Sequence, residues 1–401
     1  MRILATTFLF FMLSACGGGG GSDSSSSSSS STSSFNAALP SINLSPNSVS
    51  VNVGADSSQN SNTLYVSVTI CQPNTTACVT VDNVLLDTGS TGLRVLASAV
   101  SSLQLNPVTV KSAPIIECAS FISGSVWGPV KLADVKMSSE VASSIPIQIL
   151  ADPNYSSIPS ACGGSQGTEI TSTIKTNGIL GVGLFVNDSQ NYFNCVPTTL
   201  NNCRISLSSS LQVQNPVSAF KVDNNGVIVK LPSVSASGAS LVTGSLTFGI
   251  DTQSNNSSAG SNVIPTDSFG NFTTYFNNTT YTYSFIDSGS NALFFPSGSL
   301  SSVLVPCSSS TVLGFYCPSA TQSYTASLTL KNKVQASVDF YVANAETLVA
   351  SGNSAFSSLA GQTGSTLFDW GLPFFYGRSV YIGITGRSSN AGTGPYYAYT
   401  N

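Results

Sequence analysis

The chain carries one short acidic pattern twice, at two places far apart in the sequence. Asp-Thr-Gly-Ser fills positions 87–90 and Asp-Ser-Gly-Ser fills positions 287–290, each after an apolar run. In each half a further glycine follows a later apolar run, Gly181 in the first and Gly371 in the second, at similar separations from the acid. One such pattern is common in β-turns. The pair with matching flanks predicts two equivalent half-domains that contribute one carboxylate each, whereas the plainer alternative is two unrelated turns.

The residue types of the repeat suit a pair of carboxylates that act together. A strand can present an Asp at its tip, the glycine lets the backbone turn closely, and the last hydroxyl can bind the Asp oxygen. Two such carboxylates a few ångströms apart share one proton, so one can act as base toward water and the other as acid. The predicted catalytic residues are Asp87 and Asp287. The predicted supporting residues are Thr88, Gly89, Ser90, Ser288, Gly289 and Ser290.

Short β-like segments separated by clusters of Ser, Asn, Gly and Pro predict an all-β fold. Residues 64–70, 126–135 and 227–231 are examples. Helical periodicity is rare, and only residues 356–360 and the stretch after Pro296 are predicted as short helices.

Composition removes several classes of function. The chain has no histidine, which excludes Ser-His-Asp relays and His-ligated metal sites. Only 7% of its residues are charged, and the formal net charge is −4, so no basic surface is expected to hold a nucleic acid. We expect no metal and no cofactor.

The N-terminal residues are typical of a lipoprotein. Arg2, an apolar run at 3–13 and Leu-Ser-Ala-Cys at 13–16 predict a signal peptide over 1–16 with a lipidated Cys16. Residues 17–36 are almost entirely Gly and Ser and are expected to form a flexible tether. The residue after Cys16 is glycine, which favours the outer membrane of the cell envelope, on either its periplasmic or its outer face.

Eight further cysteines are expected to form disulfides in this oxidising compartment. They fall as neighbours along the chain: Cys71 and Cys78, Cys118 and Cys162, Cys195 and Cys203, Cys307 and Cys317. Local pairing is the simple prediction, although eight cysteines permit 105 connectivities.

From residue 64 to residue 384 the sequence resembles the pepsin-like aspartic peptidases. The residues around Asp87 and Asp287 are similar to the two active-site loops, and Gly181 and Gly371 stand in segments like those that run behind the loops. The resemblance implies an all-β, bilobal fold of two β-barrel-like lobes with a cleft between them. We expect an N-terminal lobe at 37–243 and a C-terminal lobe at 244–401. It also implies that Thr88 and Ser288 bind across the lobe interface.

The same resemblance points to a flap over the cleft, formed by Phe121, Gly124 and Ser125. Phe121 stands where the family has a tyrosine, and Arg94 stands where it has a tryptophan. An Arg94 that pointed inward would favour ionised carboxylates in the dyad and lower the working pH. Asp369 replaces an apolar residue before Gly371, and it is either a third acid near the dyad or a strand-end Asp facing solvent.

These features predict an aspartic endopeptidase that acts as a monomer on a peptide or protein and is anchored to the membrane by lipid. The combination of lipid anchor, serine tether and pepsin-like motifs is also similar to a bacterial lipoprotein family without an assigned activity. An inactive pepsin-fold surface lipoprotein that binds a peptide, protein or glycan is therefore the alternative, and a purely structural role for both turns is a third possibility.

Overall fold

The structure is a computed structural model that describes residues 44–54, 60–122, 124–162, 175–194, 203–364 and 366–401. The predicted signal peptide, the tether, Cys16 and Cys195 lie outside these residues. Strands dominate, and in the described ranges the one α-helix is α2 (Ala345–Ala350). The short 3-10 helices are η1 (Ala97–Val100), η2 (Pro153–Tyr155), η3 (Ser160–Cys162), η5 (Ser209–Leu211), η6 (Pro216–Ala219), η7 (Gly298–Leu300), η8 (Ser310–Val312) and η9 (Leu372–Phe375).

The strands form two large sheets and two small hairpins. Those that precede residue 250 are β1 (Ser48–Val53), β2 (Leu64–Cys71), β3 (Cys78–Asp87), β4 (Thr91–Leu96), β5 (Thr109–Val110), β6 (Ala113–Pro114), β7 (Ile116–Phe121), β8 (Gly124–Met137), β9 (Glu140–Leu150), β10 (Gly178–Val182), β11 (Asn191–Phe193), β12 (Arg204–Ile205), β13 (Gly226–Lys230) and β14 (Val242–Phe248). Those that follow are β15 (Asn262–Pro265), β16 (Phe272–Phe276), β17 (Thr279–Ile286), β18 (Leu293–Phe294), β19 (Gln322–Thr329), β20 (Gln335–Val342), β21 (Ala360–Gly361), β22 (Leu367–Trp370), β23 (Ser379–Gly383), β24 (Ser388–Ser389), β25 (Gly392–Thr393) and β26 (Tyr396–Thr400).

Each half of the chain contains the same three-strand arrangement around its acidic turn. In the first half, β10 runs parallel to β3 and antiparallel to β4, which places Gly181 opposite Asp87. In the second half, β22 runs parallel to β17 and antiparallel to β18, with Trp370 opposite Ile286. The central strands are buried on both faces, which explains the apolar runs before each turn. The duplication read from the sequence is therefore a duplication of structure.

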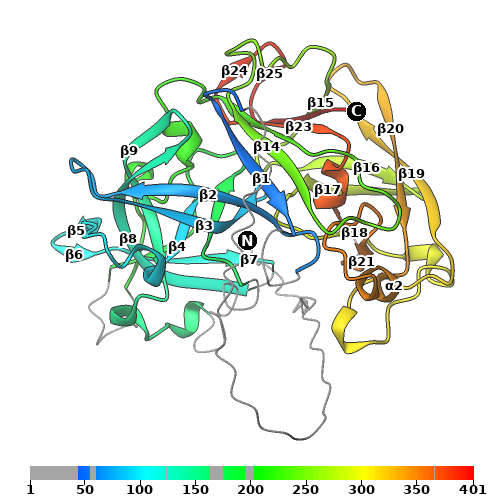
Figure 1. The fold of residues 1–401 in the computed structure, drawn as a ribbon, viewed down its shortest axis with the longest axis horizontal. Helices are drawn as coiled ribbons and strands as arrows, with labels where there is room; N and C mark the ends of the chain where they lie inside the picture. The colour runs from blue at the N-terminus through cyan, green and yellow to red at the C-terminus, as the bar shows by residue number, and fades with distance from the viewer. Residues whose placement is uncertain (1–43, 55–59, 123, 163–174, 195–202, 365) are drawn as a thin grey trace, which may run out of the picture.

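The two sheets place the acidic turns in different lobes. A seven-stranded sheet, β20-β19-β16-β17-β22-β18-β21, builds the second lobe, seen in yellow and orange in Figure 1. A fifteen-stranded sheet bends through the first lobe and continues through β1, β14, β13, β23 and β26, so chain segments from both ends share it. The predicted all-β, bilobal fold is confirmed. Our proposed lobe boundary at 243/244 falls within β14, a strand of the shared sheet.

Apolar packing fixes this arrangement. The second lobe is filled by aromatic rings, with Phe368 stacked on Trp370 at 4.6 Å and on Phe295 at 5.2 Å between ring centroids. Trp370 also donates a hydrogen bond from its indole nitrogen to Thr274 at 3.0 Å, so its one polar group is satisfied in the core. This packing holds β22 firmly behind the second acidic turn.

The sequence predicted strands better than helices. Residues 64–70, 126–135 and 227–231 lie in β2, β8 and, apart from Leu231, β13. The helix expected after Pro296 is the short η7, but the helix expected at 356–360 is wrong. There Phe356 exchanges hydrogen bonds with the Asn62 side chain and Ala360 begins β21, so tertiary partners take up the backbone groups that a helix would need.

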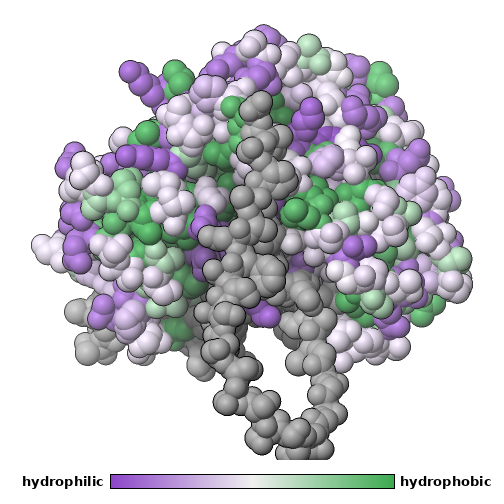
Figure 2. Space-filling model, in the orientation of Figure 1, coloured by the Kyte–Doolittle hydropathy of each residue, from purple (hydrophilic) through white to green (hydrophobic). Residues whose placement is uncertain are grey.

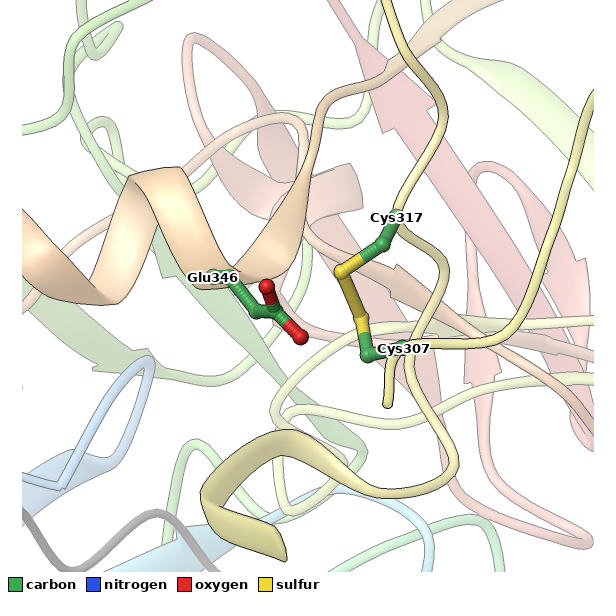
Figure 3. A group of neighbouring side chains, drawn as sticks. All are labelled: Cys307, Cys317 and Glu346. Atoms are coloured by element: carbon green, nitrogen blue, oxygen red, sulfur yellow. A yellow bond between two sulfur atoms is a disulfide. The ribbon is translucent and has the colours of Figure 1, made fainter. Parts of the chain in front are cut away.

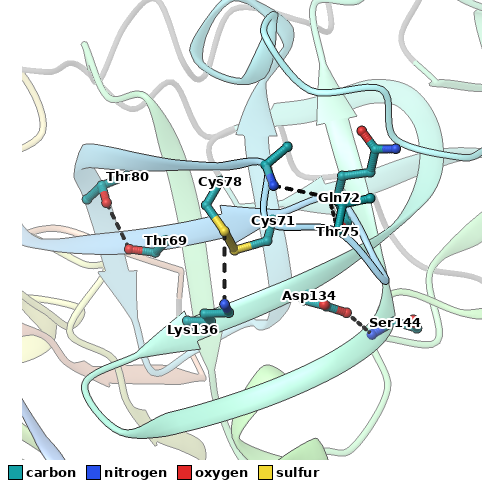
Figure 4. Close-up of a disulfide and its surroundings, with 10 residues drawn as sticks. Thr69, Cys71, Gln72, Thr75, Cys78, Thr80, Asp134, Lys136 and Ser144 are labelled. Atoms are coloured by element: carbon teal, nitrogen blue, oxygen red, sulfur yellow. Dashed lines mark hydrogen bonds between the residues drawn. A yellow bond between two sulfur atoms is a disulfide. The ribbon is translucent and has the colours of Figure 1, made fainter.

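Three of the expected disulfides are present: Cys71–Cys78, Cys118–Cys162 and Cys307–Cys317. The first closes the β2–β3 hairpin beside Lys136 of β8 (Figure 4). Cys203 is disulfide-bonded, and its expected partner Cys195 lies outside the described residues.

Polar and weakly polar side chains cover most of the visible face around the grey segment, with scattered apolar patches (Figure 2). This agrees with a chain in which uncharged polar residues outnumber charged ones. None of the helices in the described ranges has the length and apolarity needed to cross a membrane.

One buried side chain ties the start of the domain to the second lobe. Asn62, in the turn before β2, donates to the carbonyl oxygens of Asn291 and Phe356, both at 2.8 Å. Its side-chain oxygen accepts from the Phe356 N–H at 2.7 Å and from the Tyr376 hydroxyl at 2.8 Å. Its φ of 51° is one that asparagine tolerates better than most residues.

We expect Asn62→Ala to lower the free energy of unfolding by about 3 kcal/mol, because it leaves several buried polar groups without partners. Asn74→Ala is the matched control: Asn74 has a similar φ of 60° but lies exposed in a hairpin turn, so its cost should stay near 1 kcal/mol. Urea unfolding with the disulfides intact measures both. Equal losses of unfolding free energy in the two variants would show that the hydrogen bonds of Asn62 stabilise only its own turn.

Candidate active site

The two acidic turns meet at the lobe interface. The Gly89 N–H donates to Asp87 Oδ1 at 2.8 Å and to Asp287 Oδ1 at 3.1 Å, and the two carboxyl groups lie within hydrogen-bonding reach of each other. A Cβ at Gly89 would stand 2.6 Å from Asp287 Cγ, and one at Gly289 would stand 2.9 Å from Asp87 Cγ. Each glycine therefore makes room for the carboxylate of the opposite lobe.

The last hydroxyl of each pattern binds the acid of its own turn. Ser90 Oγ donates to Asp87 Oδ2 at 2.5 Å, and Ser290 Oγ donates to Asp287 Oδ2 at 2.8 Å. The Gly289 N–H completes the second turn with a bond to Asp287 Oδ1 at 2.7 Å. In both turns the glycine N–H binds Oδ1 of the acid and the last serine hydroxyl binds Oδ2, and Asp87 Oδ1 also accepts the Ser90 N–H at 3.1 Å.

The second residues of the two patterns lock the turns together. The Ser288 N–H donates to Thr88 Oγ1 at 2.9 Å, and the Thr88 N–H donates to Ser288 Oγ at 3.1 Å. Each hydroxyl then donates across the interface to a backbone carbonyl, Thr88 to Ile286 at 3.2 Å and Ser288 to Leu86 at 2.7 Å. Both side chains are fully buried. We call these four bonds the Thr88–Ser288 bridge.

Burial and like charge favour a shared proton. The pKa of Asp287 is raised well above its usual range, first by burial, then by the negative charge of Asp87 and then by that of Asp369. Two carboxyl groups in contact in a site of this kind are expected to hold one proton between them. The pair can therefore offer an acid and a base at the same pH.

The dyad lies at the base of a cleft of about 390 Å³ between the lobes. The first lobe contributes Phe121 and Ile122 to the walls, the C-terminal half contributes Phe269 and Phe285, and β26 of the shared sheet contributes Tyr397. Ile122 and Phe269 are 54% and 73% exposed, so apolar side chains stand at the rim on both sides. The cleft is lined for an occupant with apolar side chains.

The predicted flap is a hairpin of β7 and β8, in which Phe121 pairs with Gly124 and Ser120 with Ser125. The Phe121 ring lies 5.6 Å from the guanidinium carbon of Arg94, a cation–π contact. Phe121 thus packs on Arg94 at the cleft wall. Its ring carries no hydroxyl, so this side chain adds no polar group to the cleft.

We expected Arg94 to act on the dyad if its side chain pointed inward, and the structure shows that it does not act there. Its side chain is buried, and one guanidinium nitrogen donates to Glu117 at 2.7 Å and to Asp188 at 2.5 Å. Asp188 also accepts from the Tyr192 hydroxyl at 2.6 Å. Two carboxyl groups of the first lobe therefore compensate the charge of Arg94 locally, and its guanidinium group does not act on Asp287. The four side chains form what we call the Arg94 network.

Asp369 is the third acid of the site. It is 1% exposed, so the alternative of a strand-end residue facing solvent is wrong. Its pKa is raised well above the usual range, first by burial and also by the negative charge of Asp87.

Sequence reasoning did not identify Glu117 or Asp188. The available signal was weak: Glu117 interrupts the apolar run Ile115-Ile116 in a chain with few charges, which hints that it is buried and paired. Nothing in the sequence brings Asp188 next to it, because the two lie on segments that meet only in the folded lobe.

Cys307, Cys317 and Glu346 come close enough together to resemble a ligand set (Figure 3). The two sulfur atoms are bonded to each other, however, and Glu346 accepts the Ser309 N–H at 3.0 Å. The cluster is a disulfide beside a loop-capping acid, not a metal centre.

We expect Arg94→Met to cost about 3–5 kcal/mol of stability at neutral pH, because it strands two buried acids without their cation. Burial raises the pKa of Glu117, so this acid takes up its proton at a higher pH than an ordinary carboxyl group, and the loss of stability should shrink on acidification. The triple variant Arg94→Met, Glu117→Gln and Asp188→Asn should recover at least half of the loss. Urea unfolding at two pH values measures this, and a single variant within 1 kcal/mol of wild type would contradict it.

Comparison with known proteins gives a family without a known activity. The family model described as "Protein of unknown function (DUF3443)" matches residues 43–399. No curated protein matches. Among solved structures, the aspartic proteinase from Irpex lacteus is similar at a TM-score of 0.49 and 15% identity, over 88% of this chain and 96% of that chain. The family match spans nearly the whole chain, and the chain therefore belongs to the DUF3443 family.

Proposed function

We propose that this chain is an aspartic-type endopeptidase, which hydrolyses peptide bonds with a water held between Asp87 and Asp287. One observation carries the proposal: two carboxyl groups from separate lobes meet within hydrogen-bonding reach at the base of a cleft that has apolar side chains at its rim. Such a pair needs neither histidine nor metal.

The proposed reaction divides the work between the two acids. Asp287, whose pKa is raised, holds the proton and donates it toward the carbonyl oxygen of the substrate. Asp87, which accepts three hydrogen bonds from Gly89 and Ser90, takes the proton of the attacking water. The Thr88–Ser288 bridge keeps the two groups in register, because a displacement of about 1 Å would cost much of the rate.

The cleft favours an extended peptide with apolar side chains. The β7–β8 hairpin contributes Ser120, Phe121 and Ile122 to the cleft wall, and the proposal is that backbone groups of this segment bind the peptide. Ile122 and Phe269 lie exposed at its two rims, where they could contact side chains of a bound segment.

Phe121 supports a second candidate function, the binding of a peptide, protein or glycan without turnover. A tyrosine at this place would add a hydroxyl to the cleft, and phenylalanine adds none. Under this alternative, the two Asp residues would shape the cleft only.

We further propose that the domain works in the cell envelope, anchored through Cys16, and acts as a monomer on peptide or protein partners. The support is the sequence of residues 1–36 and the local disulfides, which suit an oxidising compartment. The proposed roles need no cofactor.

We expect Asp87→Asn and Asp287→Asn each to lower kcat/KM on a peptide library by at least about a thousandfold, because each removes half of the acid–base pair. Asp82→Asn is the control, since Asp82 lies exposed on the same strand as Asp87. A pepstatin-insensitive activity, or equal rates in all three variants, would exclude the proposal. A partner retained equally by wild type and the double Asn variant, without cleavage, would favour binding.

The pH profile should be acidic. Since the pKa of Asp287 is raised, the singly protonated pair persists above the usual range of a carboxyl group, and activity is lost as the pH rises through that raised value. Stability should fall over the same window, because the unfolded chain has already released this proton while the folded chain keeps it. Activity that increases steadily up to pH 9 would contradict this assignment.

A further inference from the structure

The flap is joined to the rest of the first lobe along one edge of β7. On that edge β11 pairs antiparallel with β7, and Asn191 lies opposite Cys118. A ladder that continued in this register would place Ser189 opposite Ser120. The ladder stops instead, because the backbone turns away at Ser189, whose φ is 54°. The backbone groups of Ser120 on this edge therefore receive no strand partner from β11.

The side chain of Gln190 takes the place of the missing strand. Its Oε1 accepts the Ser120 N–H at 3.1 Å, and its Nε2 donates to the Ser120 carbonyl oxygen at 3.4 Å. A carboxamide thus offers an acceptor and a donor side by side, as a peptide backbone does to its neighbour in a sheet. One side chain binds both backbone groups of this flap residue. We call these two bonds the Gln190–Ser120 latch.

The Arg94 network holds Gln190 in place. Asp188 Oδ1 accepts the Gln190 N–H at 3.2 Å, and Asp188 Oδ2 accepts from the Arg94 guanidinium at 2.5 Å. The same guanidinium packs against the ring of Phe121, the residue that follows Ser120. Two neighbouring flap residues are therefore held by one connected set of charged and polar side chains.

The latch lies in the wall of the cleft. Ser120, Phe121, Asp188 and Gln190 all line the cleft on the side of the first lobe. An occupant would contact this wall, so the position of the flap decides how much room the occupant has. The Ser120 backbone groups are already bound by Gln190 and are not free to bind a peptide.

We propose that Gln190 is a positioning residue, which fixes the base of the flap by using its side chain in place of a strand and so sets the shape in which the cleft receives a peptide. The effect on peptide hydrolysis rests on the proposed function, whereas the latch itself does not. Because the latch is formed in the free protein, its loss lets the flap occupy more conformations, which binding must then restrict. The cost falls on binding and not on the chemical step.

Amide hydrogen exchange of the full chain, resolved by residue with NMR, tests the latch without a substrate. Gln190→Ala should lower the protection of the Ser120 amide at least about fivefold, the factor expected for the loss of one hydrogen bond. Gln212→Ala is the matched control, because Gln212 also donates to a backbone carbonyl of the first lobe, that of Leu207, at 3.0 Å. Unchanged protection of Ser120 in Gln190→Ala, or an equal loss in Gln212→Ala, would overturn the latch.

Gln190→Glu separates the donor of the latch from its acceptor. A protonated carboxyl group offers one donor and one acceptor, as the carboxamide does, whereas a carboxylate only accepts and repels the Ser120 carbonyl oxygen. Relative to wild type at the same pH, protection of Ser120 should be retained well below the usual glutamate pKa of about 4.3 and should fall well above it. Wild type is the reference at each pH because the Arg94 network titrates in the same wall. An equal ratio at both pH values would contradict a latch made of two bonds.

The kinetic consequence is measured with a peptide that the protein cleaves. Gln190→Ala should raise KM about fivefold and leave kcat within about twofold of wild type, because the latch is present before and during the reaction. A fall in kcat at unchanged KM, or no change in either, would show that Gln190 does not position the flap for binding. If no peptide is cleaved, the proposed function fails, and the exchange of the Ser120 amide still decides whether the latch exists.

Discussion

The Thr88–Ser288 bridge is the contact on which the site depends. Its four hydrogen bonds join two turns that belong to different lobes, and each uses a group that would otherwise be buried without a partner. The bridge fixes the turns to each other and brings the two carboxyl groups into contact. Because the turns are this close, only glycine fits at the third position of each pattern. The spacing of the acids is therefore a property of the interface and not of either lobe alone.

Electrostatics in the site follow from the scarcity of charge in the chain. With 7% charged residues and no histidine, few cations are available to neutralise a buried acid. In the first lobe, Arg94 forms ion pairs with Glu117 and Asp188, so the charges in the cleft wall are compensated. The same guanidinium group packs against the Phe121 ring. The second lobe has no such cation beside Asp369 among its described residues, and burial raises the pKa of this carboxyl group well above its usual range. The two lobes thus solve the same problem by different chemistry.

Much of this could be predicted from sequence because it rests on local patterns. Apolar runs that end in Asp-Xaa-Gly-Ser predicted both turns, and three of the neighbouring cysteine pairs are bonded as expected. The failures involve partners distant in the chain. Residues 356–360 are not helical because Asn62 takes up their hydrogen bonds, and Arg94 does not act on the dyad because Glu117 and Asp188 surround it. The sequence position of Asp369, two residues before Gly371, was enough to make it a candidate third acid of the site. Its burial could not be predicted, because it depends on how β22 packs between β17 and β18.

The central claim is that the charge of Asp87 acts directly on Asp287, so that the two carboxyl groups work as one acid–base pair. Carbon-13 NMR of the aspartate carboxyl groups against pH tests it most directly, with Asp87→Asn as the comparison. Removing the charge of Asp87 should lower the pKa of Asp287, because that charge is the second cause of its elevation after burial. An Asp287 that titrates at the same pH in both proteins would show that the two acids do not share a proton.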